Sequence, residues 1–207
     1  TILPDADVIV NPKQPGCPYP FKGICGAMVA YKLICGLFER AGFSSHAHEE
    51  LIEFAAVATV GDVMDLVDEN RILVKEGLRR ITNTSNKGLK ALILVNNLEG
   101  KPISAYHIGF VLGPCINASG RLSTAKRALE LLMAEDEKKA AELAVDLKAL
   151  NESRKEMTAK GVEEAVQMIE TSHMDSDRVL VIYLPKCHES LAGIIAGRIR
   201  ERYAKPV

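Results

Sequence analysis

The sequence predicts a helix-rich α/β fold. Two short runs of mainly β-branched residues, 7–10 and 179–184, are typical of strands. Between them, apolar residues recur every three or four positions, which indicates amphipathic helices. The longest such pattern covers residues 136–170 and would form a helix about 50 Å long, at ~1.5 Å per residue. Near the end of the chain, a strand, a loop and a helix follow one another in the order of an α/β unit.

The remaining elements follow from local signals. Five prolines and glycines in residues 12–22 exclude both a helix and a central strand there. Turn-forming residues at 113–121 predict a loop, and Ser123 or Thr124 then caps a further helix. The shorter helical patterns cover residues 23–41, 49–58, 70–81, 87–97, 104–112 and 190–203.

Composition excludes several classes of protein. Apolar residues make up 47% of the 207 residues and the net charge is −1, which is typical of a folded soluble chain and not of a disordered tail. The absence of Trp and an aromatic content of 5% argue against a broad base-stacking platform. No apolar run approaches the ~20 residues that span a membrane, and no secretory signal opens the chain. Five cysteines without a C-x-x-C pair indicate reduced thiols in the cytoplasm.

Three segments contain residues that could carry chemistry. Asp62 follows an apolar run and Gly61, where a carboxylate near a dry core needs a partner or a metal ion. From the local pattern alone, a helix cap or a turn is the favoured explanation of this aspartate. The loop predicted at 113–121 offers donors that suit a phosphate, or it is a structural turn. The pair His188 and Glu189 precedes a stretch, 197–205, with a local charge of +3; these basic residues bind phosphates or form a solvated helix face.

Four stretches together resemble the RecJ family of single-stranded-DNA exonucleases, within the DHH phosphoesterase superfamily. They are L-P-D-A-D-V-I-V-N-P at 3–12, T-V-G-D-V-M-D-L at 59–66 with E-N-R at 69–71, I-G-F-V-L-G-P-C-I-N-A-S-G-R-L at 108–122, and C-H-E-S-L-A-G-I-I-A-G-R-I at 187–199. They occur in the family's order and extend over nearly the whole chain.

The resemblance implies a fold and its division. Residues 1–134 would be the C-terminal part of a DHH catalytic domain, 135–172 a long connecting helix, and 173–207 the N-terminal part of a DHHA1 α/β domain. The family's leading aspartate motifs, its Asp-His-His triplet and the end of the second domain have no counterpart here. The two ends of the chain therefore look like cuts through domains, and we expect the chain alone to be inactive.

The resemblance also implies an activity. The family degrades single-stranded DNA from 5′ to 3′ in DNA repair and recombination, by phosphodiester hydrolysis with two Mn²⁺ or Mg²⁺ ions held mostly by residues that this chain lacks. Asp62 matches a metal ligand, and Arg121 would hold a phosphate oxygen. Contact with DNA is implied for Asn117, Ser119, Gly120, Arg121, His188, Glu189 and Arg198. The sequence does not identify protein partners.

The sequence departs from the family at three of the matched positions. Cys115 replaces a common arginine, Cys187 a common tryptophan and Asp65 a common proline. The first two changes remove a possible phosphate contact and an aromatic surface. Two other functions therefore stay open: a DHH phosphoesterase acting on short oligonucleotides or cyclic dinucleotides, and a non-catalytic nucleic-acid-binding relative.

Overall fold

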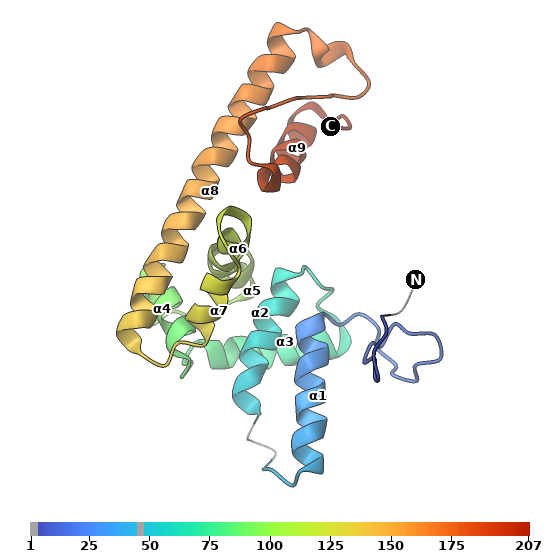
Figure 1. Ribbon diagram of the computed structural model, residues 1–207, viewed down its shortest axis with the longest axis vertical. Helices are drawn as coiled ribbons and strands as arrows, with labels where there is room; N and C mark the ends of the chain where they lie inside the picture. The colour runs from blue at the N-terminus through green and yellow to red at the C-terminus, as the bar shows by residue number, and fades with distance from the viewer. Residues whose placement is uncertain (1–3, 45–47) are drawn as a thin grey trace. The chain divides into compact units, whose positions relative to one another are not determined.

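The computed structural model describes residues 4–44 and 48–207, and the described residues are mainly helical (Figure 1). Leu3, the first residue of the first family-like stretch, lies outside them. The chain forms two compact units. Unit 1 contains residues 1–85 and 98–113, and unit 2 contains residues 86–97 and 114–207. The predicted division at 134 and 172 refers to parts of a longer family fold, and it stays a prediction.

Unit 1 is built on three helices and a short helical segment. They are α1 (Gly26–Arg40), α2 (Ile52–Gly61), which the 3-10 turn η1 (Glu49–Leu51) precedes, α3 (Asp68–Ile81), and α5 (Ala105–His107), which continues into the π-helix η2 (Ile108–Leu112). A small core forms where Met28 and Ala55 pack with residues 24 and 25. The helical patterns predicted for this region are confirmed.

Helices α2 and α3 pack backbone to backbone at Gly77. A Cβ atom at this position would lie 2.4 Å from Ala56 Cβ and 2.9 Å from the carbonyl oxygen of Ile52. Asn70, at the start of α3, is fully buried and donates from Nδ2 to the carbonyl oxygen of Gly23, at 2.7 Å. These contacts fix the orientation of α2 within unit 1, and with it the position of Asp62 at the end of α2.

Unit 2 is built around one long helix, α8 (Glu137–Thr171) (Figure 1). Asp136 caps it by accepting a hydrogen bond from the Lys139 N–H at 2.7 Å, which is where the sequence predicted the start. The other elements are α4 (Lys87–Val95), α6 (Gly113–Leu122), α7 (Lys126–Leu132), the 3-10 turn η3 (Met174–Ser176) and α9 (Glu189–Tyr203). The first half of α8 packs on α4 and α7, and its second half packs on α9.

The predicted strands are not formed. Among residues 4–44 and 48–207 no segment pairs into a sheet, so the helix-rich part of the predicted class is confirmed and its α/β part is not. Residues 179–184 do alternate as a strand would, with Leu180 1% exposed and Val181 77% exposed. The Leu180 N–H donates to the carbonyl oxygen of Pro206 at 2.9 Å. A strand needs a neighbouring strand for its remaining backbone groups, and the described residues supply none.

The loop predicted at 113–121 is wrong, because these residues form helix α6. Pro114 is the second residue of α6, directly after the π-helix η2, and it supplies no backbone N–H to the continuous helical segment. Gly113 is required where η2 passes into α6, since a Cβ atom there would lie 2.6 Å from the carbonyl oxygen of Ile108. Burial of Cys115, Ala118 and Ser119 stabilises a helix that local propensity does not favour.

Candidate functional site

Asp62 occupies the C-cap of α2. Its N–H donates to the carbonyl oxygen of Ala58 at 2.8 Å, and its side chain is exposed. The expectation that this carboxylate lies near a dry core is therefore wrong. The side chain is instead presented to solvent at the end of a helix that is buried further back, at Ala55, Ala56 and Thr59.

The residue after Asp62 has a strained backbone. Val63 has a φ of 54°, in the left-handed region, and its side chain is 87% exposed. A β-branched residue rarely adopts this conformation, which costs about 1–3 kcal/mol. Its N–H donates to the carbonyl oxygen of Val60 at 3.1 Å, and the Met64 N–H donates to that of Thr59 at 3.1 Å. Strained backbone of this kind is concentrated at functional sites. A valine in the sequence does not predict it.

The described residues do not form a metal centre. Nowhere in residues 4–44 and 48–207 do three His, Cys, Asp or Glu side chains come together in a group that could hold an ion. A site with two divalent ions needs several oxygen or nitrogen ligands. Asp62 can supply one of them, so this chain by itself does not fit the expected metal site.

Helix α6 separates its candidate residues onto two faces. Asn117, Gly120 and Arg121 are exposed, as their spacing on a helix predicts. Ser119 is fully buried, and its hydroxyl donates to the carbonyl oxygen of Ile116 at 2.9 Å. Ser119 therefore offers no donor to a ligand. Three of the four residues expected to bind DNA on this segment share a solvent-facing surface.

Cys115 lies on the buried face of α6. It is 1% exposed, and the Asn151 side-chain amide on α8 approaches its sulfur to 3.7 Å. Burial raises the pKa of the Cys115 thiol, and hydrogen bonding from Asn96 opposes that rise. A thiol in this position contributes to packing between helices and has no access to a phosphate.

Arg121 and His188 both contact Ser190 at the start of α9 in unit 2. Arg121 donates from Nη1 to the carbonyl oxygen of Ser190 at 2.9 Å, and the Ser190 hydroxyl donates to the carbonyl oxygen of Arg121 at 3.1 Å. His188 caps α9, with Nδ1 accepting from the Ser190 N–H at 3.3 Å and lying 2.8 Å from its hydroxyl. The structure therefore joins two segments, 69 positions apart, that the sequence had marked separately.

The remaining candidates on α9 differ in their surroundings. Glu189 is the first residue of the helix and is exposed, where the helix dipole favours a negative charge. Arg198 is exposed and forms an ion pair with Glu201 at 3.3 Å. Ten residues of helix, or about 15 Å at ~1.5 Å per residue, separate Arg198 from His188. Arg198 is therefore not part of the group around Ser190.

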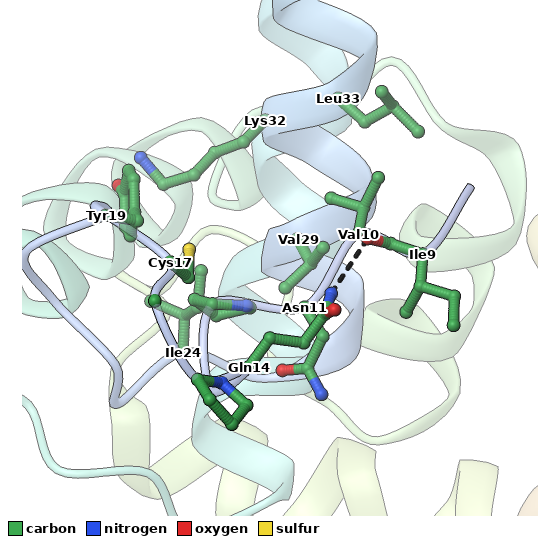
Figure 2. Close-up of a pocket in the computed structure, with 13 residues that line it drawn as sticks. Ile9, Val10, Asn11, Gln14, Cys17, Tyr19, Ile24, Val29, Lys32 and Leu33 are labelled. Carbon is green, nitrogen blue, oxygen red and sulfur yellow. Dashed lines mark hydrogen bonds between the residues drawn. The ribbon is translucent and has the colours of Figure 1, made fainter. Parts of the chain in front are cut away.

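A cavity of ≈ 520 Å³ lies in unit 1 between residues 9–17 and α1 (Figure 2). Its lining is mainly apolar, with Lys32 and Tyr19 at one side. Both of these side chains contact Glu69: the Tyr19 hydroxyl donates to it at 2.6 Å, and Lys32 Nζ lies 2.5 Å from it. Burial would raise the pKa of Glu69, but the bonds from Lys32 and Tyr19 outweigh burial and lower it. The cavity therefore offers apolar surface without a free charged group, and we assign it no chemistry.

The structure also contains a buried carboxylate that the sequence analysis missed. Glu53 on α2 is 5% exposed, and the Thr84 hydroxyl donates to it at 2.5 Å. Burial raises the pKa of Glu53, and the hydrogen bond from Thr84 opposes that rise. In the sequence, the position of Glu53 among apolar residues of the helical pattern at 49–58 could have indicated that its side chain is buried. Glu53 joins α2 to the end of the helix that follows, so its role is structural.

Comparison with known proteins identifies relatives along nearly the whole chain. The single-stranded-DNA-specific exonuclease RecJ of Bacillus subtilis is 37% identical over 204 residues, which are 99% of this chain and 25% of that protein. RecJ of Escherichia coli is 35% identical over 218 residues, covering 99% of this chain and 38% of that protein. No protein-family model matches the chain.

Solved structures show the same similarity. RecJ from Thermus thermophilus in complex with Mg²⁺ matches 92% of this chain with a TM-score of 0.80 and 34% identity, over 29% of that structure's chain. An exonuclease RecJ bound to manganese matches 92% with a TM-score of 0.81 and 33% identity, over 48% of that chain. The chain thus spans between a quarter and a half of the proteins it matches.

Proposed function

We propose that this chain is a segment of a RecJ-family protein and forms part of a metal-dependent exonuclease acting on single-stranded DNA. The observation that carries the proposal is the match along 99% of the chain to RecJ proteins at 35–37% identity, together with a TM-score of 0.80 to a RecJ structure. Digestion from 5′ to 3′ and a role in DNA repair and recombination belong to the same proposal.

Asp62 would contribute one carboxylate ligand to a divalent ion. Its exposed position at the end of α2, beside the strained Val63, supports this role. Among the described residues, Asp62 does not lie in a group of three side chains that could hold an ion. We therefore derive no chemical step from this chain alone. Mn²⁺ or Mg²⁺, the ions present in the solved RecJ structures, suit a carboxylate oxygen.

Arg121 and His188 would hold the DNA backbone in unit 2. Both are exposed and both form a hydrogen bond with Ser190, which supports a shared role. A guanidinium group and the start of a helix both favour a phosphate. Asn117 and Gly120 on the exposed face of α6 would extend this surface, with Glu189 at its edge. Arg198, away from this group, would contribute only general positive charge.

The proposal is tested in the complete protein that contains this chain, by Mn²⁺-dependent degradation of a labelled single-stranded oligonucleotide. Asp62→Ala should lower the rate by more than about 100-fold, since even residues that only orient metal ligands cost about 10- to 100-fold. Asp65→Ala is the matched control, because Asp65 is exposed in the same turn and matches no family ligand. A rate for Asp62→Ala within a few fold of the control contradicts the ligand assignment.

A non-catalytic nucleic-acid-binding protein is the second candidate. The observation that favours it is the lack of a metal-ligand cluster in the described residues. A complete protein that binds single-stranded DNA with normal affinity but degrades neither long strands nor dinucleotides in Mn²⁺ would support this candidate. Preferential cleavage of dinucleotides would instead support a DHH phosphoesterase of another substrate class.

The location is proposed as cytoplasmic. All five cysteines are free thiols, including the buried Cys25 and Cys115, as expected in a reducing compartment. None of the helices in the described residues is both long enough and apolar enough to cross a membrane.

A further inference from the structure

Two aromatic side chains form an exposed pair on α5 and η2 in unit 1. Tyr106 is 64% exposed and Phe110 is 71% exposed. Their ring centroids lie 5.1 Å apart, with 31° between the ring planes. Residues four apart on a helix lie on one side of it, so the two rings present a joint apolar face to solvent. Aromatic pairs favour stacked or edge-to-face packing, so this pair offers an apolar face on which a further flat ring can stack.

The backbone beneath this pair is held firmly. Ile108 and Leu112, on the opposite side of the segment, are 0% and 1% exposed and anchor it in the unit. The Ser104 N–H donates to Nδ1 of His107 at 3.1 Å, which fixes that ring. The His107 ring in turn lies edge-on to Tyr106, with centroids 6.0 Å apart. A ligand that stacks on the pair thus meets rings that lose little freedom on binding.

The pair lies on a segment that packs against the helix carrying Asp62. A Cβ atom on Gly109 would lie 3.8 Å from Cγ1 of Val60, so η2 touches the last turn of α2. Asp62 caps the same turn. The π-helical turn itself is unusual, and such turns occur frequently at functional sites. The exposed rings and the candidate ligand are therefore carried by two neighbouring segments of unit 1.

We propose that Tyr106 and Phe110 form a base-stacking subsite for single-stranded nucleic acid. This rests on the proposed function and adds to it the surface that holds a base. Every base has an aromatic face, so the subsite accepts any base and would contribute affinity without sequence preference. The low aromatic content excludes a broad platform, but two rings are sufficient for one base.

The experiment measures binding of the complete protein that contains this chain, without divalent metal ions so that no strand is cleaved, to two labelled oligonucleotides of equal length, one of thymidines and one without bases. Both carry the same number of phosphates, so their difference isolates the contribution of the bases. Stacking of one base corresponds to a preference of about 5- to 150-fold for the strand with bases. Tyr106→Ala with Phe110→Ala should abolish this preference and leave binding of the abasic strand unchanged, whereas Tyr106→Phe should retain it.

Phe43→Ala is the matched control. Phe43 is 61% exposed in the same unit and pairs with Phe38 at a centroid distance of 5.2 Å, but it belongs to neither α5 nor η2. This variant should keep the preference, and circular dichroism checks that each variant is folded. An equal loss in Phe43→Ala, an unchanged preference in the double variant, or no preference for the strand with bases in the unmodified complete protein each overturns the subsite. A preference that depends on the pair, in a complete protein without nuclease activity, supports the subsite and refutes the proposed exonuclease.

Discussion

Replacing Gly77 with alanine should destabilise the chain, although the same change stabilises an exposed helix. In a helix interior, Gly→Ala gains about 0.8–1 kcal/mol from propensity alone. At Gly77, however, the new Cβ would lie 2.4 Å from Ala56 Cβ, 1.0 Å inside the 3.4 Å at which ordinary contact begins. It would also lie 2.9 Å from the carbonyl oxygen of Ile52, so backbone as well as side chain must move.

Overpacking of this kind costs about 1–3 kcal/mol and sometimes more. Because the displaced atoms include backbone, we take the upper end, about 3 kcal/mol, and expect a net loss of about 2 kcal/mol after the propensity gain. For a chain of this length, that corresponds to a fall in Tm of about 4–8 °C. Urea unfolding followed by circular dichroism at 222 nm measures the free energy, and a thermal scan measures Tm.

Gly36→Ala provides the matched control. Gly36 lies inside α1, and beyond its own helical turn a Cβ atom there would meet nothing within 4 Å. This variant should gain about 1 kcal/mol. If Gly77→Ala proves as stable as Gly36→Ala, the close approach of α2 and α3 is wrong, and with it the argument for how Asp62 is positioned.

Three further predictions follow from single contacts. Asp136→Ala removes the cap of α8 and should lower the free energy of unfolding by about 1 kcal/mol in urea titrations, with an unchanged value arguing against the cap. Burial raises the pKa of Glu53 above its unfolded value. The contribution of Glu53 to stability is therefore complete below about pH 4.5 and is lost as the pH rises through the raised pKa. Glu53→Gln should flatten the dependence of unfolding free energy on pH above 4.5, and an unaltered slope would refute this. Cys115, whose thiol is buried with a raised pKa, should react with a thiol reagent at pH 8 far more slowly than Cys187 until urea is added, as peptide mapping would measure; equal rates in the native protein would contradict its burial.

Local patterns predicted the elements that local chemistry determines. Helix α8 was expected at 136–170 and spans Glu137–Thr171, because a regular apolar stripe and the capping Asp136 both identify it. Helix α6 was missed because its glycines, proline and asparagine favour turns. Burial of Ala118 and Cys115 against other helices outweighs those preferences, and no local pattern reports such packing.

The candidate site was predictable residue by residue but not as an arrangement. Asp62 and Arg121 were marked from the motifs that contain them. The reciprocal bonds between Arg121 and Ser190 join positions 69 apart, a distance that no short-range periodicity can reveal. The exposed pair of Tyr106 and Phe110 was also missed, because the aromatic content of a sequence does not show which rings lie together on the surface.

The extended segment 179–184 has a consequence for handling the chain in solution. No strand among residues 4–44 and 48–207 pairs with its backbone, and Val179, Val181 and Tyr183 are 52%, 77% and 75% exposed. An open apolar edge of this kind is a template on which another chain adds, so concentrated solutions of the purified chain should self-associate through it. Val181→Lys places a charge on that edge without touching the core, and is therefore the first substitution to make before crystallisation or NMR.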